Sequence, residues 1–308
     1  MNRIYFSESN LEKKWSSMKP GILSNFFREV VEPERLEDFM EKRPKTDVEF
    51  EIYSNSGDNG IVLVVPTPDS QGKNASTLKD SFQDSTIVFV ESSGEFFNYA
   101  HSCNAGVKKA LELNPRWIII SNDDIKLEKP PNDLFELMAQ KNDADFLIPV
   151  NAKYTFITKS GFLSILLTSL TALFTGRIYQ FKAQMHVALN RKMRPFLINI
   201  VVSSSPLQTL VKSFSDKIET EFQMCGFFMI AKADVFKRYK FDETFINDVE
   251  DVDLMMRLNK DGTKIDTINF VVDQVGGDSF KRIQTDEMRG IRDIANKIHL
   301  GIKLLKRG

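Results

Sequence analysis

Residues 61–66, with the sequence IVLVVP, form a continuous run dominated by β-branched side chains. Such a run is typical of a strand that is buried on both faces of a sheet. Helical patterns at 97–111 and 133–140 alternate with further apolar runs. These runs lie at 85–90, 117–121 and 145–150. Because strands and helices alternate over short links, the sequence predicts an α/β fold with a mostly parallel, Rossmann-like central sheet, flanked by helices and joined by right-handed crossovers.

Two later segments continue this pattern. GFFMIAKADVF, at 226–236, reads as a strand followed by the start of a helix, and 267–274 reads as a late strand. We therefore assign residues 58–280 to one α/β domain.

Three segments stand outside the alternation of strands and helices. Residues 1–57 are expected to form an N-terminal extension with one short helix at 33–42, and residues 151–215 an insertion. Residues 281–308 place apolar side chains on one stripe and Lys and Arg on the other faces, which predicts a basic amphipathic C-terminal helix. This helix would either dock on the domain or contact an anionic membrane surface.

Composition and charge narrow the class of protein. Of the 308 residues, 42% are hydrophobic and 27% charged, which is ordinary for a globular protein, and the formal net charge of -1 argues against nucleic acid as a partner. Two cysteines are too few for a disulfide framework and indicate a reducing compartment. The first 15 residues lack the apolar core of a secretory signal, and we find no run of about 20 apolar residues. We expect a cytoplasmic protein, with a peripheral position on the inner face of a membrane if the C-terminal helix binds lipid.

An acidic group follows the third predicted strand directly. Asn122, Asp123 and Asp124 close the apolar run at 117–121, and ligands of parallel sheets bind beyond the carboxyl ends of the strands, where Thr67 and Glu91 are also expected. Carboxylate oxygens suit Mg²⁺ or Mn²⁺ held together with substrate phosphates. A strand-ending turn rich in Asn and Asp is the alternative interpretation.

A second acidic group begins a helical pattern at 245–258, FINDVEDVDLMMRL. Four carboxylates, Asp248, Glu250, Asp251 and Asp253, precede or enter the first turn. They would stabilise the positive end of the helix dipole, or supply a general base.

The order of these pieces carries a resemblance. IVLVVPTP, IVFVESSG, FNYAHSCNAGVKKAL, IIISNDDI and CGFFMIAKADVFKRYKFDETFINDVEDVDLMMRL follow one another over about residues 60–280. Together they resemble the family 2 glycosyltransferases, an inverting group with the GT-A fold, and particularly the rhamnosyltransferase-like members. The resemblance implies a nucleotide-diphospho-sugar donor, a divalent metal, and a glycan or lipid-linked acceptor, which the insertion at 151–215 would help to bind.

The resemblance also implies roles for individual residues. Asp251 and Glu250 match the family's acidic pair, with Asp251 as catalytic base and Glu250 in the acceptor site. Asp124 matches the last position of the metal-binding acidic motif, and Asp273 or Gln274 would replace a His that the family often carries after the late strand. The donor is expected to contact the remaining matched positions, which are Pro66, Thr67, Glu91, Asn104, Gly106, Asn122 and Asp123.

Two other functions remain open at this point. A sugar-phosphate nucleotidyltransferase should carry a Gly-rich loop with a basic residue after the first strand, and the chain offers only Gly72 and Lys73 there. A catalytically inactive GT-A domain that acts as a binding partner or scaffold would explain Asn122 and the missing His.

Overall fold

The computed structural model describes residues 33–54, 59–94, 96–158, 218–275, 295–296 and 299–304. The predictions for most of the N-terminal extension, for the insertion beyond residue 158 and for the start of the C-terminal helix lie outside these residues. The predicted short helix is present as α3 (Pro33–Lys42). No helix in the described part of the chain is both long enough and apolar enough to cross a membrane.

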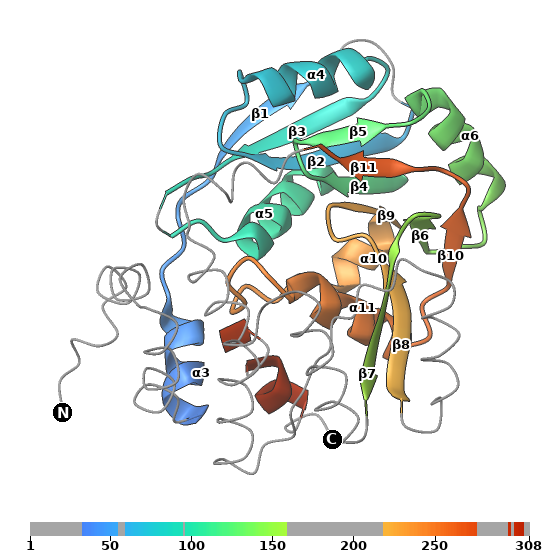
Figure 1. The fold of residues 1–308 in the computed structure, drawn as a ribbon. Coiled ribbons are helices and arrows are strands. Elements are labelled where there is room, and N and C mark those ends of the chain that lie inside the picture. The colour runs from blue at the N-terminus through green and yellow to red at the C-terminus, as the bar shows by residue number, and fades with distance from the viewer. Residues whose placement is uncertain are drawn as a thin grey trace.

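A seven-stranded mixed sheet forms the centre of the molecule (Figure 1), and it confirms the α/β class. The strand order is β1-β3-β2-β4-β9-β6-β10. The strands are β1 (Glu49–Tyr53), β2 (Ile61–Thr67), β3 (Thr86–Glu91), β4 (Trp117–Ser121), β6 (Phe146–Pro149), β9 (Phe228–Lys232) and β10 (Ile265–Ile268).

Two strands run against the others. β1 pairs antiparallel with β3 at one edge, and β9 lies antiparallel between β4 and β6, whereas the β3–β2, β2–β4 and β6–β10 pairs are parallel. The sheet therefore begins within the segment expected to be an N-terminal extension. The sequence did not predict either reversal.

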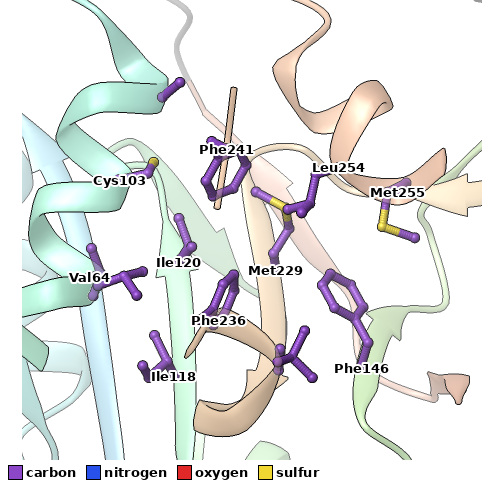
Figure 2. Packing of buried hydrophobic residues seen from close by; sticks show 14 of the residues in the cluster. Val64, Cys103, Ile118, Ile120, Phe146, Met229, Phe236, Phe241, Leu254 and Met255 are labelled. Carbon is purple, nitrogen blue, oxygen red and sulfur yellow. The ribbon is translucent and has the colours of Figure 1, made fainter. Parts of the chain in front are cut away.

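Helices cover both faces of the sheet (Figure 1). Even-numbered residues of β2, β3 and β4 pack with α5, α10 and α11, and odd-numbered residues of the same strands pack with α4 and α6. Figure 2 shows the first of these cores, where Val64, Ile118 and Ile120 meet Cys103 and Phe241. The helices are α4 (Lys73–Ser81), α5 (Tyr99–Leu111), α6 (Pro131–Gln140), α10 (Ala233–Arg238) and α11 (Glu250–Lys260).

Gly106 lets α5 approach the sheet closely. A Cβ at Gly106 would lie 2.5 Å from Cγ2 of Val90 and closer still to Cγ1 of Val64. Any larger residue would therefore push α5 away from β2 and β3. The sequence assigned Gly106 to the donor site, and in the structure it meets the core.

Two small antiparallel pairs lie beside the main sheet. β5 (Ile125–Leu127) pairs with β11 (Val272–Gln274), and β7 (Lys153–Thr158) pairs with β8 (Ile218–Met224). The late strand predicted at 267–274 is thus two strands, β10 and β11, in two different sheets. Phe270, which is 1% exposed, lies in the turn between them.

A candidate active site at the carboxyl edge of the sheet

The parallel strands β2, β3 and β4 bring three polar groups to one edge of the sheet. Thr67 ends β2 directly opposite Glu91, which ends β3, and β4 leads into Asn122–Asp124. Since β9 runs in reverse, the Cys225–Phe227 turn that enters it reaches the same edge, and the Asn122 N–H donates to the Phe227 carbonyl at 2.9 Å. The predicted meeting of strand ends is confirmed for these residues.

Asp123 is tied back to β2. The Thr67 hydroxyl donates to Oδ2 of Asp123 at 2.8 Å, and Thr67 is only 2% exposed. Burial raises the pKa of Asp123, hydrogen bonds from Thr67 and Asn74 oppose the rise, and the charge of Asp124 adds to it. Pro66 is buried in the same strand. Thr67 and Asp123 thus join two strand ends to each other, in addition to any contact with a ligand.

Asp124 meets Gln274 across the small β5–β11 pair. Nε2 of Gln274 donates to both carboxylate oxygens of Asp124, at 3.1 and 3.2 Å, and the Val275 N–H donates to the Asp124 carbonyl at 2.8 Å. Gln274 is paired with Ile125, the residue after Asp124. Of the two candidates for the replacement of the family's His, Gln274 is therefore the one that contacts Asp124.

Asp273 points elsewhere because consecutive side chains of a strand point to opposite faces. It is paired with Lys126, and its Oδ1 lies 3.4 Å from Nδ2 of Asn151, which also donates to the Val272 carbonyl at 2.8 Å. The predicted metal role of Asp273 is thus not supported by its position.

Any cation at the acidic edge would be held by few protein atoms. In the described ranges, no group of three or more His, Cys, Asp and Glu side chains could hold a metal ion. Asp124 supplies two oxygens, and rotation of the Gln274 amide by 180° would supply a third in place of its donor. Mg²⁺ and Mn²⁺ are commonly bound by one or two protein oxygens with substrate phosphates and water.

Glu91 and Ser92 form the part of the edge where β3 ends. Oε2 of Glu91 accepts from the hydroxyl of Ser70 at 2.6 Å and from its N–H at 3.3 Å. Ser92 is 6% exposed, and its hydroxyl has no hydrogen-bond partner among the described residues. A buried hydroxyl without a partner is costly unless a ligand or an ordered water binds it, and no sequence signal marked this residue.

Asn104 supports the loop between α10 and α11. Its Nδ2 donates to the Phe241 carbonyl at 2.9 Å, and its Oδ1 accepts from the Phe241 N–H at 2.9 Å. Nδ2 also donates to Glu243 at 2.9 Å, and Glu243 pairs with His101. The side chain expected at the nucleotide therefore fixes a loop, as does His101.

Asp251 stands at the start of α11 against the Cys225–Phe227 turn. A Cβ on Gly226 would lie 3.0 Å from Cγ of Asp251 and would overlap Oδ2. Burial raises the pKa of Asp251 to about 6, although hydrogen bonds from backbone N–H groups and the positive charge of Lys153 oppose the rise. Asp251 is half-buried, and it lies beside the turn whose last residue, Phe227, accepts from the Asn122 N–H.

The other carboxylates of this helix face inward. Glu250 is 5% exposed. The pKa values of Tyr99 and Cys103 on α5 are raised mainly by burial, and the negative charge of Glu250 adds to the rise. Asp253 is fully buried and accepts from Nε of Arg257 at 2.8 Å. Asp251 is therefore the carboxylate of α11 that meets the Cys225–Phe227 turn, and Asp253 has a structural role.

The turn at residues 247–249, which precedes α11 and Asp251, has an uncommon backbone conformation. Asn247 and Val249 have φ angles of 50° and 74°. A β-branched residue in the left-handed region is strained and persists only where its surroundings fix it, and such strain often occurs at functional sites. Asn247 helps to fix the turn, since its side chain accepts from the Tyr99 N–H at 2.6 Å and donates to the Phe97 carbonyl at 3.0 Å.

Comparison with known proteins adds no family to this geometry. The chain matches no protein-family model and no curated protein.

Proposed function

We propose that the chain is an inverting glycosyltransferase with the GT-A fold, which moves one sugar from a nucleotide-diphospho-sugar to a hydroxyl of an acceptor. The observation that carries the proposal is the carboxylate of Asp251 beside Gly226, with its pKa raised to about 6. A carboxylate with a pKa near the working pH is well matched to removing a proton from a hydroxyl.

The reaction is a single displacement. Asp251 takes the proton of the acceptor hydroxyl while that oxygen forms a bond to the anomeric carbon. The bond from the anomeric carbon to the phosphate oxygen breaks, and its electron pair leaves with the nucleoside diphosphate. Attack opposite the leaving group inverts the anomeric configuration.

The donor would lie along the carboxyl edge of the sheet. Glu91 and the hydroxyl of Ser92, which has no hydrogen-bond partner among the described residues, would face the nucleoside, because Glu91 ends β3 beside Thr67 and Ser92 follows it. Asp124 and Gln274 would hold Mg²⁺ or Mn²⁺, which would neutralise the charge that develops on the departing diphosphate. The mixed sheet with helices on both faces supports the Rossmann-like α/β architecture that the proposal requires.

The acceptor is proposed to be a glycan or a lipid-linked molecule on the cytoplasmic side of a membrane. Lys153 begins β7 opposite Met224, two residues before Gly226, and its charge opposes the rise in the pKa of Asp251. β7 lies within the insertion predicted at 151–215. An acceptor bound there would present its hydroxyl to Asp251.

The loop after β2 does not favour the nucleotidyltransferase alternative. Its Asp69 carbonyl accepts from the Gly72 N–H at 3.2 Å, and its Asp69 carboxylate accepts from the Gln71 N–H at 3.0 Å. These N–H groups are used within the loop, whereas phosphate binding would require them to be open.

Ligand binding tests the donor site. Thermal unfolding is measured with UDP, GDP and dTDP, each with and without Mn²⁺, because a ligand that binds the folded state raises its apparent stability. At least one nucleotide should raise the unfolding temperature more with Mn²⁺ than without it. The absence of a shift with all of them would refute the donor site.

Activity tests the base. With the nucleotide that binds, Asp251→Asn should abolish sugar transfer and donor hydrolysis while binding is retained. If the parent protein binds the nucleotide but neither transfers nor hydrolyses a donor sugar, the catalytic proposal is wrong and the chain is a binding domain.

A further inference from the structure

The loop that carries Asp251 is held from two sides. We define the base loop as residues 242–249, between α10 and α11. On one side, Nδ2 of Asn98 at the start of α5 donates to the carbonyls of Glu243 and Phe245, at 3.1 and 2.9 Å. On the other side lie helical residues of the C-terminal segment, which appear in red beside the loop in Figure 1.

Asn296 binds both backbone groups of one residue in the base loop. Its Oδ1 accepts from the Ile246 N–H at 2.8 Å, and its Nδ2 donates to the Ile246 carbonyl at 3.0 Å. Asn296 is fully buried, so water cannot replace these bonds. The two residues are 50 positions apart in the sequence, and Ile246 immediately precedes Asn247, which has a left-handed backbone.

Two further C-terminal side chains hold the start of the same loop. Nζ of Lys303 donates to Asp242 and, at 2.9 Å, to the Thr244 hydroxyl, and it lies 5.2 Å from the centre of the Phe245 ring. Nε2 of His299 lies 2.8 Å from the Thr244 hydroxyl, and its ring packs edge-on against Phe245 at 5.2 Å. The described C-terminal residues are therefore docked on the domain, and the Lys303 ammonium is engaged there.

We propose that Asn296 is a positioning residue for the proposed transfer, because it fixes Ile246 and through the strained turn at Asn247 and Val249 keeps the Asp251 carboxylate against Gly226. The inference rests on the proposed function. It gives the C-terminal segment a part in catalysis although it lies far from Asp251 in sequence. Without the hydrogen bonds from Asn296 to Ile246, the turn at Asn247 and Val249 would relax, and the Asp251 carboxylate would move toward water.

The test compares Asn296→Ala with the parent protein and with Asn59→Ala. Asn59 is a matched control: it also joins backbone groups, since its Nδ2 donates to the Asp84 carbonyl at 2.9 Å and its Oδ1 accepts from the Ile61 N–H at 3.0 Å. It lies before β2, at the amino edge of the sheet, so Asn59→Ala should leave kcat unchanged. Lys303→Met is the second variant, and it keeps the apolar stem near Phe245 while removing the ammonium.

The expected result is a loss in kcat on the order of 10- to 100-fold for Asn296→Ala, because small displacements of a reacting group reduce rates by such factors. Nucleoside diphosphate affinity, measured by calorimetry, should stay within about twofold, since the binding residues lie on other elements. The acidic limb of the pH–kcat profile should move from about 6 toward the ordinary aspartate value, because the carboxylate becomes hydrated. Lys303→Met should also lower kcat and move the acidic limb of the pH–kcat profile toward the ordinary aspartate value.

Direct titration of the Asp251 carboxylate by ¹³C NMR, assigned by its loss in Asp251→Asn, decides the question independently of turnover. A lower pKa in Asn296→Ala, with no change in Asn59→Ala, supports positioning. An unchanged pKa and pH–kcat profile in a folded Asn296→Ala variant would overturn it, and if that variant does not fold, the same criterion applies to Lys303→Met. If the parent protein shows no transfer with any donor, the proposed function fails, and the titration still decides whether Asn296 positions Asp251.

Discussion

The carboxylate of Asp251 and the Cα of Gly226 lie so close that no side chain fits between them. A Cβ at position 226 would be 3.0 Å from Cγ of Asp251 and would overlap Oδ2. The contact joins the start of α11 to the turn that enters β9, and thereby sets the Asp251 carboxylate at the edge where β2, β3 and β4 end.

Gly226→Ala should destabilise the protein by about 1 to 3 kcal/mol, because an added methyl group must displace the Asp251 carboxylate. In an Asp251→Ala background the obstacle is absent, and the same change should cost much less. Urea unfolding of the four proteins in this double-mutant cycle measures the coupling. Additive free energies of unfolding would show that the two residues are not in contact.

Asp251→Asn should stabilise the protein at neutral pH while it abolishes transfer. The pKa of Asp251 is about 6 in the folded chain against an ordinary value of 3.8, so the folded state binds the proton more tightly and the parent loses stability as pH rises from about 4 through 6. At pH 8 the asparagine variant should gain about 2 to 3 kcal/mol, and below pH 4 the two proteins should match. Urea unfolding at pH 4, 6 and 8 checks this, and a pH-independent difference would contradict it.

Lys303→Met should show the opposite dependence on pH. Burial alone would raise the pKa of Asp242, but hydrogen bonds from Lys303 and Thr244 lower it to about 2. The resulting stability is present above the ordinary value of 3.8 and is lost as pH falls through 2, so the variant should lose on the order of 2 kcal/mol at pH 7 and much less near pH 2.

Lys237→Met is the control for this measurement. The ion pair of Lys237 with Asp234 leaves both side chains largely exposed, at 55% and 79%, and exposed pairs contribute little. Unfolding followed by circular dichroism at both pH values compares the two variants. Equal losses for the buried and the exposed pair would contradict the role assigned to Lys303.

Gln274→Leu should weaken the Mn²⁺-dependent part of nucleotide binding, and Asp124→Asn should remove it. Both changes take away an oxygen at the proposed cation site, and Asp124 carries the charge. Asp273→Asn should have a smaller effect, because Asp273 lies on the other side of β11. Thermal unfolding with the nucleotide and a Mn²⁺ titration separates the three. A larger effect of Asp273→Asn than of the other two changes would instead indicate that Asp273 binds the metal ion.

The sequence predicted those elements whose side chains are buried on both faces of the sheet, such as β2 and β4. It did not predict β1, whose Phe50 and Ile52 are 44% and 43% exposed, because an edge strand does not need a continuous apolar pattern. α4 was missed for a similar reason, since only Ala75 and Leu78 of its nine residues are buried.

The site was predictable only where a single segment carries its signal. The sequence marked two acidic groups, one after the strand at 117–121 and one at 248–253, and the resemblance singled out Asp124 and Asp251 within them. Their positions at one sheet edge support that interpretation. The contact of Gln274 with Asp124 joins residues 150 positions apart and depends on the pairing of two three-residue strands, which no local pattern encodes. The direction of β9, which places Gly226 beside Asp251, depends likewise on the fold as a whole.

The β7–β8 pair works as a closed stem. Its strands are paired from Lys153 and Met224 at one end to Thr158 and Ile218 at the other, so residues 158 and 218 are held side by side. Changes in length or composition between residues 158 and 218 can therefore accumulate beyond the stem without altering the register of Met224, two residues before Gly226. The position of the Asp251 carboxylate beside Gly226 is in this way insulated from changes in that segment.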